Sequence, residues 1–401
     1  MEGSHPDPRG VPLALYVHVP WCESKCPYCD FNSHALKTLL PEEQYIDALL
    51  HDLELDLTDN AGALGTRQIE SIFFGGGTPS LLSGKAISRL LDRIRQRVAC
   101  NDDLEVSLEA NPGSSDSSKF KEYRKAGVTR LSLGVQTFNP DHLHGLGRIH
   151  SPDQAQSAIQ AAKDAGFKNL NIDLMFGLHN QTIAEAILDV KQSIKYGPAH
   201  ISCYQLTIEP NTWFYHHPPE LPDDELLWDM QESIAQELER AGYKRYEVSA
   251  FARDDFTCKH NLNYWRFGDY LGIGAGAHGK ITGPGGIART WKVKHPRFYL
   301  AKADTSQRIG GKTAIAEKEI ILEFMLNALR LRERIDASLF YARTGLQLGS
   351  LESELRAAQQ EGLLDWDDTG LRASEHGYRY LNDLLDRFVP DPFTDSQIMH
   401  G

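Results

Sequence analysis

Up to residue 248 the chain alternates short apolar stretches with longer amphipathic ones. Six apolar stretches predict buried strands, at residues 13–19, 69–74, 104–109, 129–135, 168–175 and 200–206. Apolar residues at helical spacing follow each of them and predict helices, near residues 42–57, 84–98, 117–126, 152–165, 183–196 and 225–241. A seventh short strand is predicted at 243–248. This alternation predicts an α/β fold, a partial (β/α)6-type TIM barrel built on a parallel sheet.

The pattern changes after the predicted barrel. Residues 261–286 are dense in glycine and aromatic residues and are predicted to form loops. The last segment predicts a hairpin at 363–372 among helices at 317–334, 337–344, 351–360 and 374–388. We therefore expect a flexible N-terminus (1–10), a barrel core (11–290) and a smaller, mainly helical C-terminal module of winged-helix type (305–390).

Composition and charge narrow the function classes. The 401 residues include 42 Lys and Arg against 55 Asp and Glu, a net charge of −13, which argues against a general binder of nucleic acid or anionic membranes. The longest near-apolar stretch, 11–21, is interrupted by His18 and Pro20 and lacks the flanks of a signal peptide. A cytoplasmic location is expected, with the six cysteines as reduced thiols.

Three of those cysteines lie within eight positions. Cys22, Cys26 and Cys29 have the spacing C-x3-C-x2-C, and thiolates on one short loop suit a 4Fe–4S cluster. Three ligands leave one of the four irons open to a substrate or cofactor. A zinc site is the alternative, with His18 or His34 as the fourth ligand. The spacing favours the cluster and leaves both open.

Polar residues and glycines occur near the carboxyl ends of the predicted strands. A Gly75–Thr78 turn follows the second strand, and Glu109, Gln136 and Asp173 lie at or near the ends of the next three. Polar side chains in apolar strands are unfavourable without partners, and single cases are usually satisfied in the core. α/β barrels place their sites at the carboxyl ends of the strands. The occurrence of polar residues or glycines at this edge in several successive strands therefore predicts one ligand cavity.

The cysteine motif, with Tyr28 before its last cysteine and a strand before it, resembles that of the radical S-adenosylmethionine superfamily. The resemblance implies that Cys22, Cys26 and Cys29 ligate a 4Fe–4S cluster. It also implies that S-adenosylmethionine chelates the open iron through its amino and carboxylate groups. One-electron reduction would then cleave it to a 5'-deoxyadenosyl radical.

Four segments narrow the resemblance, namely YVHVPWCESKCPYCDF, FFGGGTPSLL, Glu-Ala-Asn-Pro and Gly-Val-Gln-Thr-Phe. They are similar, within a likeness spanning residues 12–380, to the branch that holds oxygen-independent coproporphyrinogen III dehydrogenases and heme chaperones. That branch implies contacts to the cluster-bound S-adenosylmethionine from Tyr16, Gly76 and Glu109. It implies a second S-adenosylmethionine site lined by Tyr28, Gly77, Thr78, Gln136, Arg148 and Asp173.

Two features separate the members of this branch. The dehydrogenases carry a fourth cysteine two places after the third, where this chain has Phe31, which cannot replace a thiol. Residues 260–265, His-Asn-Leu-Asn-Tyr-Trp, match the chaperones' His-Asn-x-x-Tyr-Trp motif, associated with heme binding. Imidazole is a common axial ligand of heme iron, so the resemblance implies His260 in that role. The alternative is an ordinary hydrogen-bonded histidine.

The expected function is therefore that of a heme chaperone, which binds heme and delivers it to hemoprotein acceptors such as membrane respiratory enzymes. A coproporphyrinogen III dehydrogenase is the alternative that Phe31 opposes, and a radical enzyme with another substrate is a third. A homodimer is left open, and no nucleic-acid partner is expected. His278 is expected in a close-approach loop, and the His216-His217 pair in an exposed loop where metal binding is the less favoured alternative.

Overall fold

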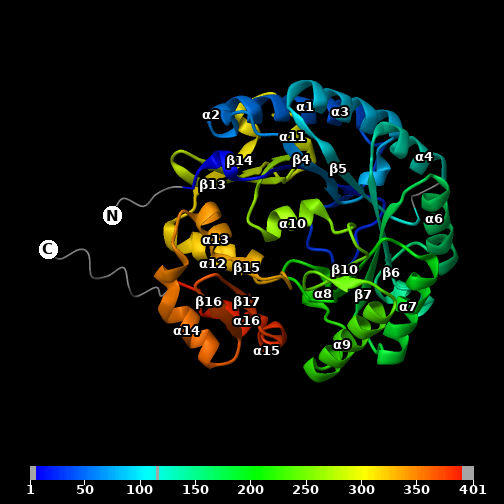
Figure 1. Ribbon diagram of the computed structural model, residues 1–401. Coiled ribbons are helices and arrows are strands. Elements are labelled where there is room, and N and C mark those ends of the chain that lie inside the picture. The colour runs from blue at the N-terminus through cyan, green and yellow to red at the C-terminus, as the bar shows by residue number, and fades with distance from the viewer. Residues whose placement is uncertain (1–5, 114–116, 391–401) are drawn as a thin grey trace.

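The computed structural model describes residues 6–113 and 117–390, which contain a twelve-stranded sheet curved into a partial barrel (Figure 1). Six parallel strands lie side by side in chain order, β1 (Leu13–Val19), β4 (Ile69–Gly76), β5 (Cys100–Ala110), β6 (Arg130–Gln136), β7 (Asn169–Phe176) and β8 (His200–Gln205). The predicted α/β fold with a partial barrel is confirmed. The parallel strands place all their carboxyl ends on one edge of the sheet.

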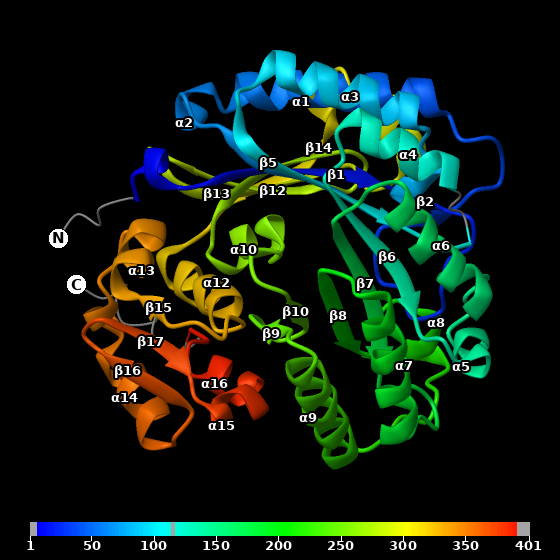
Figure 2. The same ribbon diagram turned by 45° about the vertical axis from the view of Figure 1, so that its right-hand side comes forward.

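Helices cover the outer face of this sheet, and Figure 2 shows them as a layer around its convex side. They are α1 (Glu42–Asp59), α3 (Gly84–Arg97), α4 (Ser117–Ala126), α6 (Pro152–Asp164), α7 (Ile183–Tyr196) and α9 (Asp224–Arg240). Capping boxes start two of them, at Ser151 with Gln154 and at Thr182 with Glu185. Alternate residues of β1, such as Leu15 and Val17, join the apolar core, which leaves the other residues facing the inside of the curve.

The predicted seventh strand is confirmed for two residues only. Residues 243–248 do not extend the parallel sheet, because the chain reverses after β9 (Lys244–Arg245) and pairs it antiparallel with β10 (Ala250–Ala252). The Glu247 carboxylate accepts hydrogen bonds from the amide and hydroxyl of Ser249, which stabilises the reversal. Strand β10 then pairs antiparallel with β8 and ends the parallel series.

The loop prediction for residues 261–286 is also wrong. This region holds α10 (Lys259–Trp265), and β11 (Asp269–Ile273) pairs parallel with β1 and continues antiparallel into β12 (His278–Gly283), β13 (Gly286–Lys292) and β14 (Ile309–Ala314). The glycines allow neighbouring segments of the backbone to approach closely, because a Cβ on Gly272 would lie 1.8 Å from the carbonyl oxygen of His278. A Cβ on Gly274, whose φ is +107°, would lie 2.5 Å from the carbonyl oxygen of His18. The expected close approach of the backbone is therefore present, but within a sheet.

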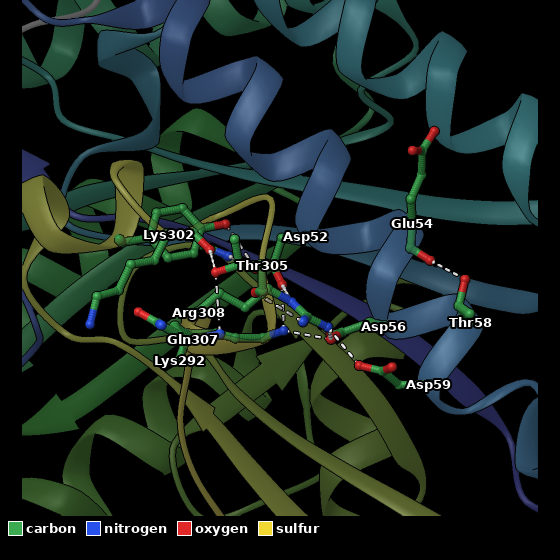
Figure 3. A network of polar contacts seen from close by, with 12 residues as sticks. Asp52, Glu54, Asp56, Thr58, Asp59, Lys292, Lys302, Thr305, Gln307 and Arg308 are labelled. Carbon is green, nitrogen blue, oxygen red and sulfur yellow. Dashed lines mark hydrogen bonds and ion pairs between the residues drawn. The ribbon is translucent and has the colours of Figure 1, made fainter.

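A buried ionic network ties α1 to this antiparallel extension (Figure 3). Asp52 accepts hydrogen bonds from Lys292 at 2.5 Å, from Arg308 at 2.9 Å and from the Tyr299 hydroxyl at 2.8 Å. Asp56 shares both cations, at 2.6 Å and 2.8 Å. Because the carboxylates and the cations come from segments more than 230 residues apart in sequence, the network holds the helix layer on the sheet.

The C-terminal module has a separate apolar core, to which Phe324, Phe340 and Leu371 contribute. Its helices are α12 (Glu317–Ala328), α13 (Ala337–Thr344), α14 (Glu352–Gln360), α15 (Glu375–Arg379) and α16 (Leu381–Asp386). Its sheet has the order β15 (Ile335–Asp336), β17 (Gly370–Ala373) and β16 (Leu364–Asp367). The hairpin prediction is confirmed, whereas the first helix ends six residues early and the last is broken at Tyr380.

Short elements complete the chain. The helices α2 (Ala61–Leu64), α5 (Pro140–Gly145), α8 (Trp213–His216) and α11 (Pro296–Leu300) lie in the connections, and β2 (Trp21–Cys22) pairs with β3 (His34–Ala35). Of the segment predicted to be flexible, residues 1–5 lie outside the described residues and Pro8–Gly10 form a 3-10 helix capped by Asp7. Among the helices of the described residues, none has the length and apolarity that crossing a bilayer requires.

Candidate functional site

The three clustered cysteines line one cavity of about 400 Å³ at the carboxyl ends of the parallel strands. Cys22 lies in β2, and the amide of Cys29 donates a hydrogen bond to the carbonyl of Cys26 at 3.2 Å, which tightens the loop between them. Burial raises the pKa of the Cys22 and Cys29 thiols. Metal binding would therefore release protons from this loop.

Most of the other predicted site residues lie on the walls of the same cavity. The structure brings together Tyr28, Gly76, Gly77, Thr78, Glu109, Gln136, Arg148 and Asp173. They come from the cysteine loop, the ends of successive strands and, in the case of Arg148, the segment that follows α5. Tyr16 and His260 do not line the cavity, because both lie deeper within the curve of the sheet.

The glycine turn after β4 is held directly against the cysteine loop. The amide of Gly77 donates to the carbonyl of Val19 and the amide of Thr78 to that of Trp21, both at 2.7 Å. A Cβ on Gly77 would lie 2.4 Å from the oxygen of Trp21, and Gly76 has φ +109°. Only glycine allows this approach, so the turn and the loop form one wall.

Two carboxylates face the cavity from neighbouring parts of the sheet. Burial, together with the negative charge of Asp173, raises the pKa of Glu109 to about 8. Burial also raises the pKa of Asp173, although Ser132 and Asn171 each donate a hydrogen bond to it at 2.7 Å. A cationic ligand would relieve the repulsion between the two carboxylates, so this part of the wall suits a positively charged group.

Arg148 is the one Lys or Arg among the described residues that line the cavity, and its guanidinium lies within reach of a cysteine. Its guanidinium donates to Sγ of Cys26 at 3.6 Å and to the carbonyl of Gly134 at 2.8 Å, and it also contacts Asn111. The positive charge of Arg148 opposes the effect of burial on the nearby Tyr28 hydroxyl, whose pKa is nevertheless raised. Arg148 thus stabilises negative charge on the sulfur of Cys26.

The thiol set and the glycine cradle fit a 4Fe–4S cluster with an open iron, because each cysteine would ligate a different iron. They fit a single zinc ion less well. Within residues 6–113 and 117–390, no three His, Cys, Asp or Glu side chains converge as ligands of one ion. His18, one suggested fourth ligand, has both ring nitrogens engaged, Nδ1 with the Tyr16 hydroxyl at 3.1 Å and Nε2 with the carbonyl of Asn32 at 2.9 Å.

His260 lies on α10, inside the curve of the sheet, and is 1 % exposed. Its Nδ1 contacts the Ser71 hydroxyl at 3.0 Å and its Nε2 the Tyr264 hydroxyl at 3.1 Å, while its ring stacks on Phe73. Burial lowers the pKa of His260 to about 3, so it is neutral. An iron atom could reach this imidazole only if one of these two hydrogen bonds were broken.

The sequence motifs missed several residues of the cavity. Ser132 and Gly134 line it together with Met175 and Tyr204, and none of the four was predicted as a site residue, although Gly134 opens the Gly-Val-Gln-Thr-Phe segment. A signal was available, however, because Ser132, Gly134 and Gln136 are spaced two apart along β6 and therefore face the same side. The same spacing separates Asp173 from Met175 in β7.

Comparisons with known proteins match two parts of the chain to known domain families. Residues 16–191 match the model of the radical SAM superfamily, and residues 315–380 match the HemN C-terminal domain. The fold resembles that of coproporphyrinogen III oxidase (HemN) from Escherichia coli, with a TM-score of 0.78 and 24 % identity over 95 % of this chain and 90 % of that one. The fold and cysteine loop thus define a radical SAM protein, a class that carries a 4Fe–4S cluster and S-adenosylmethionine.

Closer relatives narrow the class. The chain is 47 % identical to the heme chaperone HemW of Haemophilus influenzae, over 96 % of this chain and all of that protein. It is 46 % identical to that of Escherichia coli (95 % and 99 %) and 33 % identical to that of Bacillus subtilis (94 % and 99 %). The chain belongs to the HemW family.

Proposed function

We propose that this protein is a heme chaperone, which binds heme and passes it to hemoprotein acceptors, membrane respiratory enzymes among them. The observation that carries the proposal is the likeness, over nearly the whole chain, to relatives that are named heme chaperones. Phe31 supports it, because it stands where the dehydrogenases have a fourth cysteine and is 57 % exposed at the cavity. Cytoplasmic location and a homodimer belong to the same proposal.

Within this proposal Cys22, Cys26 and Cys29 hold the 4Fe–4S cluster. Tyr16, Gly76 and Glu109 contact the S-adenosylmethionine that caps the open iron, although Tyr16 would act from below the cavity wall. A second S-adenosylmethionine would use Tyr28, Gly77, Thr78, Gln136, Arg148 and Asp173. The cluster and its cofactor supply one-electron reducing chemistry. The barrel core spans residues 11–290, and the C-terminal module spans 305–390.

His260 is the axial heme ligand that the family motif suggests. The bonds from its ring to Ser71 and Tyr264 mean that it can serve only after α10 opens. Replacement by alanine, His260→Ala, should then weaken stoichiometric heme binding and leave cleavage of S-adenosylmethionine intact. Unchanged heme affinity would remove His260 from this role.

The alternative function, oxidative decarboxylation of coproporphyrinogen III, is not favoured, and the likeness to HemN at 24 % identity concerns the fold alone. An anaerobic assay separates the two functions. Protein with a reconstituted cluster, first checked for reductive cleavage of S-adenosylmethionine, is incubated with coproporphyrinogen III and reductant, and porphyrins are separated by chromatography.

The chaperone proposal expects no loss of carboxylates from the porphyrin and stoichiometric binding of heme by the same preparation. A decarboxylated product would overturn it and demonstrate that Phe31 does not prevent the chemistry. The variant Phe31→Cys is a matched control, because it restores the thiol of the dehydrogenases at an exposed position. If Phe31→Cys, and not wild type, decarboxylates coproporphyrinogen III or gains a thiolate ligand, residue 31 accounts for the difference in activity between this protein and the dehydrogenases.

A further inference from the structure

The short helix α8 lies beside the cysteine loop (Figure 2). It carries a group of exposed aromatic rings. Trp213 is 62 % exposed and Tyr215 54 % exposed, and His216 and His217 follow them on the surface. Large exposed aromatic side chains on a soluble domain mark contact sites when they gather in one place. The sequence indicated an exposed pair of histidines here but not the helix that presents them.

The ring of His217 is held in one orientation and one tautomer. Its Nδ1 lies 3.4 Å from the carbonyl oxygen of Trp213, and because a carbonyl only accepts, Nδ1 carries the proton. The indole of Trp213 stacks on the imidazole at 3.9 Å with an interplanar angle of 14°. The lone pair therefore lies on Nε2 of an exposed ring. Histidines that bind metals typically donate their other ring nitrogen to a carbonyl in this way.

Helix α8 is attached to the wall of the cavity. The amide of Phe214 donates to the carbonyl of Pro27, in the cysteine loop, at 3.0 Å, and its ring lies 6.4 Å from that of Tyr28. Phe214 also packs with Met175 and Leu206, which line the cavity. A ligand on the outer side of α8 would thus lie close to the cysteine loop, to which Phe214 attaches the helix.

The other histidine considered for heme is closed off in the folded protein. His260 is buried and both of its ring nitrogens have hydrogen-bond partners, whereas His217 needs no rearrangement to reach iron. A porphyrin bound to Nε2 of His217 stands perpendicular to the imidazole. The indole of Trp213, nearly parallel to the imidazole, would then meet the porphyrin in the edge-to-face arrangement that aromatic groups favour.

We propose that iron protoporphyrin docks on the surface of α8, with Nε2 of His217 as its axial ligand and the rings of Trp213 and Tyr215 as apolar contacts. This inference rests on the proposed function, since it names where the chaperone takes up its heme. It assigns the first contact of heme to His217 on the surface, before the opening of α10 that ligation by His260 requires.

Titration of the full-length, cluster-loaded protein with hemin, followed by the Soret band, tests the assignment. His217→Ala should weaken binding about tenfold or more and change the axial-ligand signature in electron paramagnetic resonance, because a metal ligand is lost. Exogenous imidazole should restore that signature in His217→Gly. Iron-free protoporphyrin IX should bind wild type and His217→Ala equally, because it has no metal to ligate.

The control is His376→Ala, which removes another exposed histidine beside a tyrosine ring, in the C-terminal module. Iron content and the unfolding transition check that each variant is intact. If wild type binds hemin and His217→Ala binds it with the same affinity and spectrum, the assignment is overturned and the chaperone function stands. If His260→Ala loses hemin binding and His217→Ala keeps it, the assignment of His217 is also overturned. If wild type fails to bind hemin, the proposed function itself fails.

Discussion

The guanidinium of Arg148 donates a hydrogen bond to Sγ of Cys26 at 3.6 Å. Hydrogen bonds and positive charge at a ligating sulfur favour the reduced cluster, since reduction adds negative charge. Arg148→Gln should therefore shift the reduction potential of the cluster to more negative values. A redox titration monitored by electron paramagnetic resonance measures this, with Arg93→Gln on the outer helix α3 as a control. An unchanged potential would contradict a role for Arg148 at the sulfur.

Glu109 predicts a pH dependence of cofactor binding. Burial raises its pKa to about 8, so below that pH the ligand-free carboxyl is neutral, and a cationic ligand must displace its proton. The affinity for S-adenosylmethionine should rise about tenfold per pH unit up to pH 8, relative to Glu109→Gln, and then level off. Equilibrium binding measured between pH 6 and 9 checks this, and parallel curves for the two proteins would refute it.

Gly77 and Gly62 predict opposite effects of the same substitution. A Cβ on Gly77 would lie 2.4 Å from the carbonyl oxygen of Trp21, so Gly77→Ala should destabilise the protein by about 1–3 kcal/mol and impair retention of iron. Gly62, in α2, has open space around it, and Gly62→Ala should stabilise by about 0.5–1 kcal/mol. Chemical denaturation and iron analysis measure both; equal effects would be inconsistent with the close approach.

The network of Figure 3 predicts a large loss of stability. Asp52→Asn leaves the buried cations of Lys292 and Arg308 partly uncompensated, which should lower the free energy of unfolding by about 3–5 kcal/mol. The exposed pair of Glu352 and Arg356 on α14 is the control, and Glu352→Gln should change stability by about 0.3–0.5 kcal/mol. Denaturant titration compares the two variants. If Asp52→Asn lowers the free energy of unfolding no more than Glu352→Gln changes it, the network contributes little to stability.

His260 predicts a loss of stability in acid. Its folded-state pKa is about 3 against an ordinary value of 6.5, so between these pH values the unfolded chain binds one more proton than the folded one. Stability from this group is present above pH 6.5 and is lost as the pH falls. Wild type should lose about 1.4 kcal/mol per pH unit more than His260→Gln between pH 6 and 4. Unfolding curves at several pH values test the difference, with His376→Gln as the exposed control.

Much of the fold and of the cavity could be predicted because the signals are local. Each strand of the barrel is a short apolar stretch, and Glu109, Gln136 and Asp173 lie near the ends of strands that the sheet then aligns. The strands β11–β14 were missed because their glycines resemble loop residues. Those glycines are required by contacts between chain segments, such as Gly272 against His278, and such contacts leave no periodic pattern.

The sequence by itself determined the order of the six parallel strands and the helices between them, the cysteine loop and the set of polar residues at one edge, since these follow from periodicity and spacing. Only the tertiary structure decided which residues are reachable. The sequence favours the family motif at His260 over the plain pair at His216-His217, but it does not say which of them is accessible. Folding buries His260 between Ser71 and Tyr264, while the anchoring of Phe214 leaves His217 on the surface. Access to a side chain depends on what distant segments pack against it, and no local pattern records that.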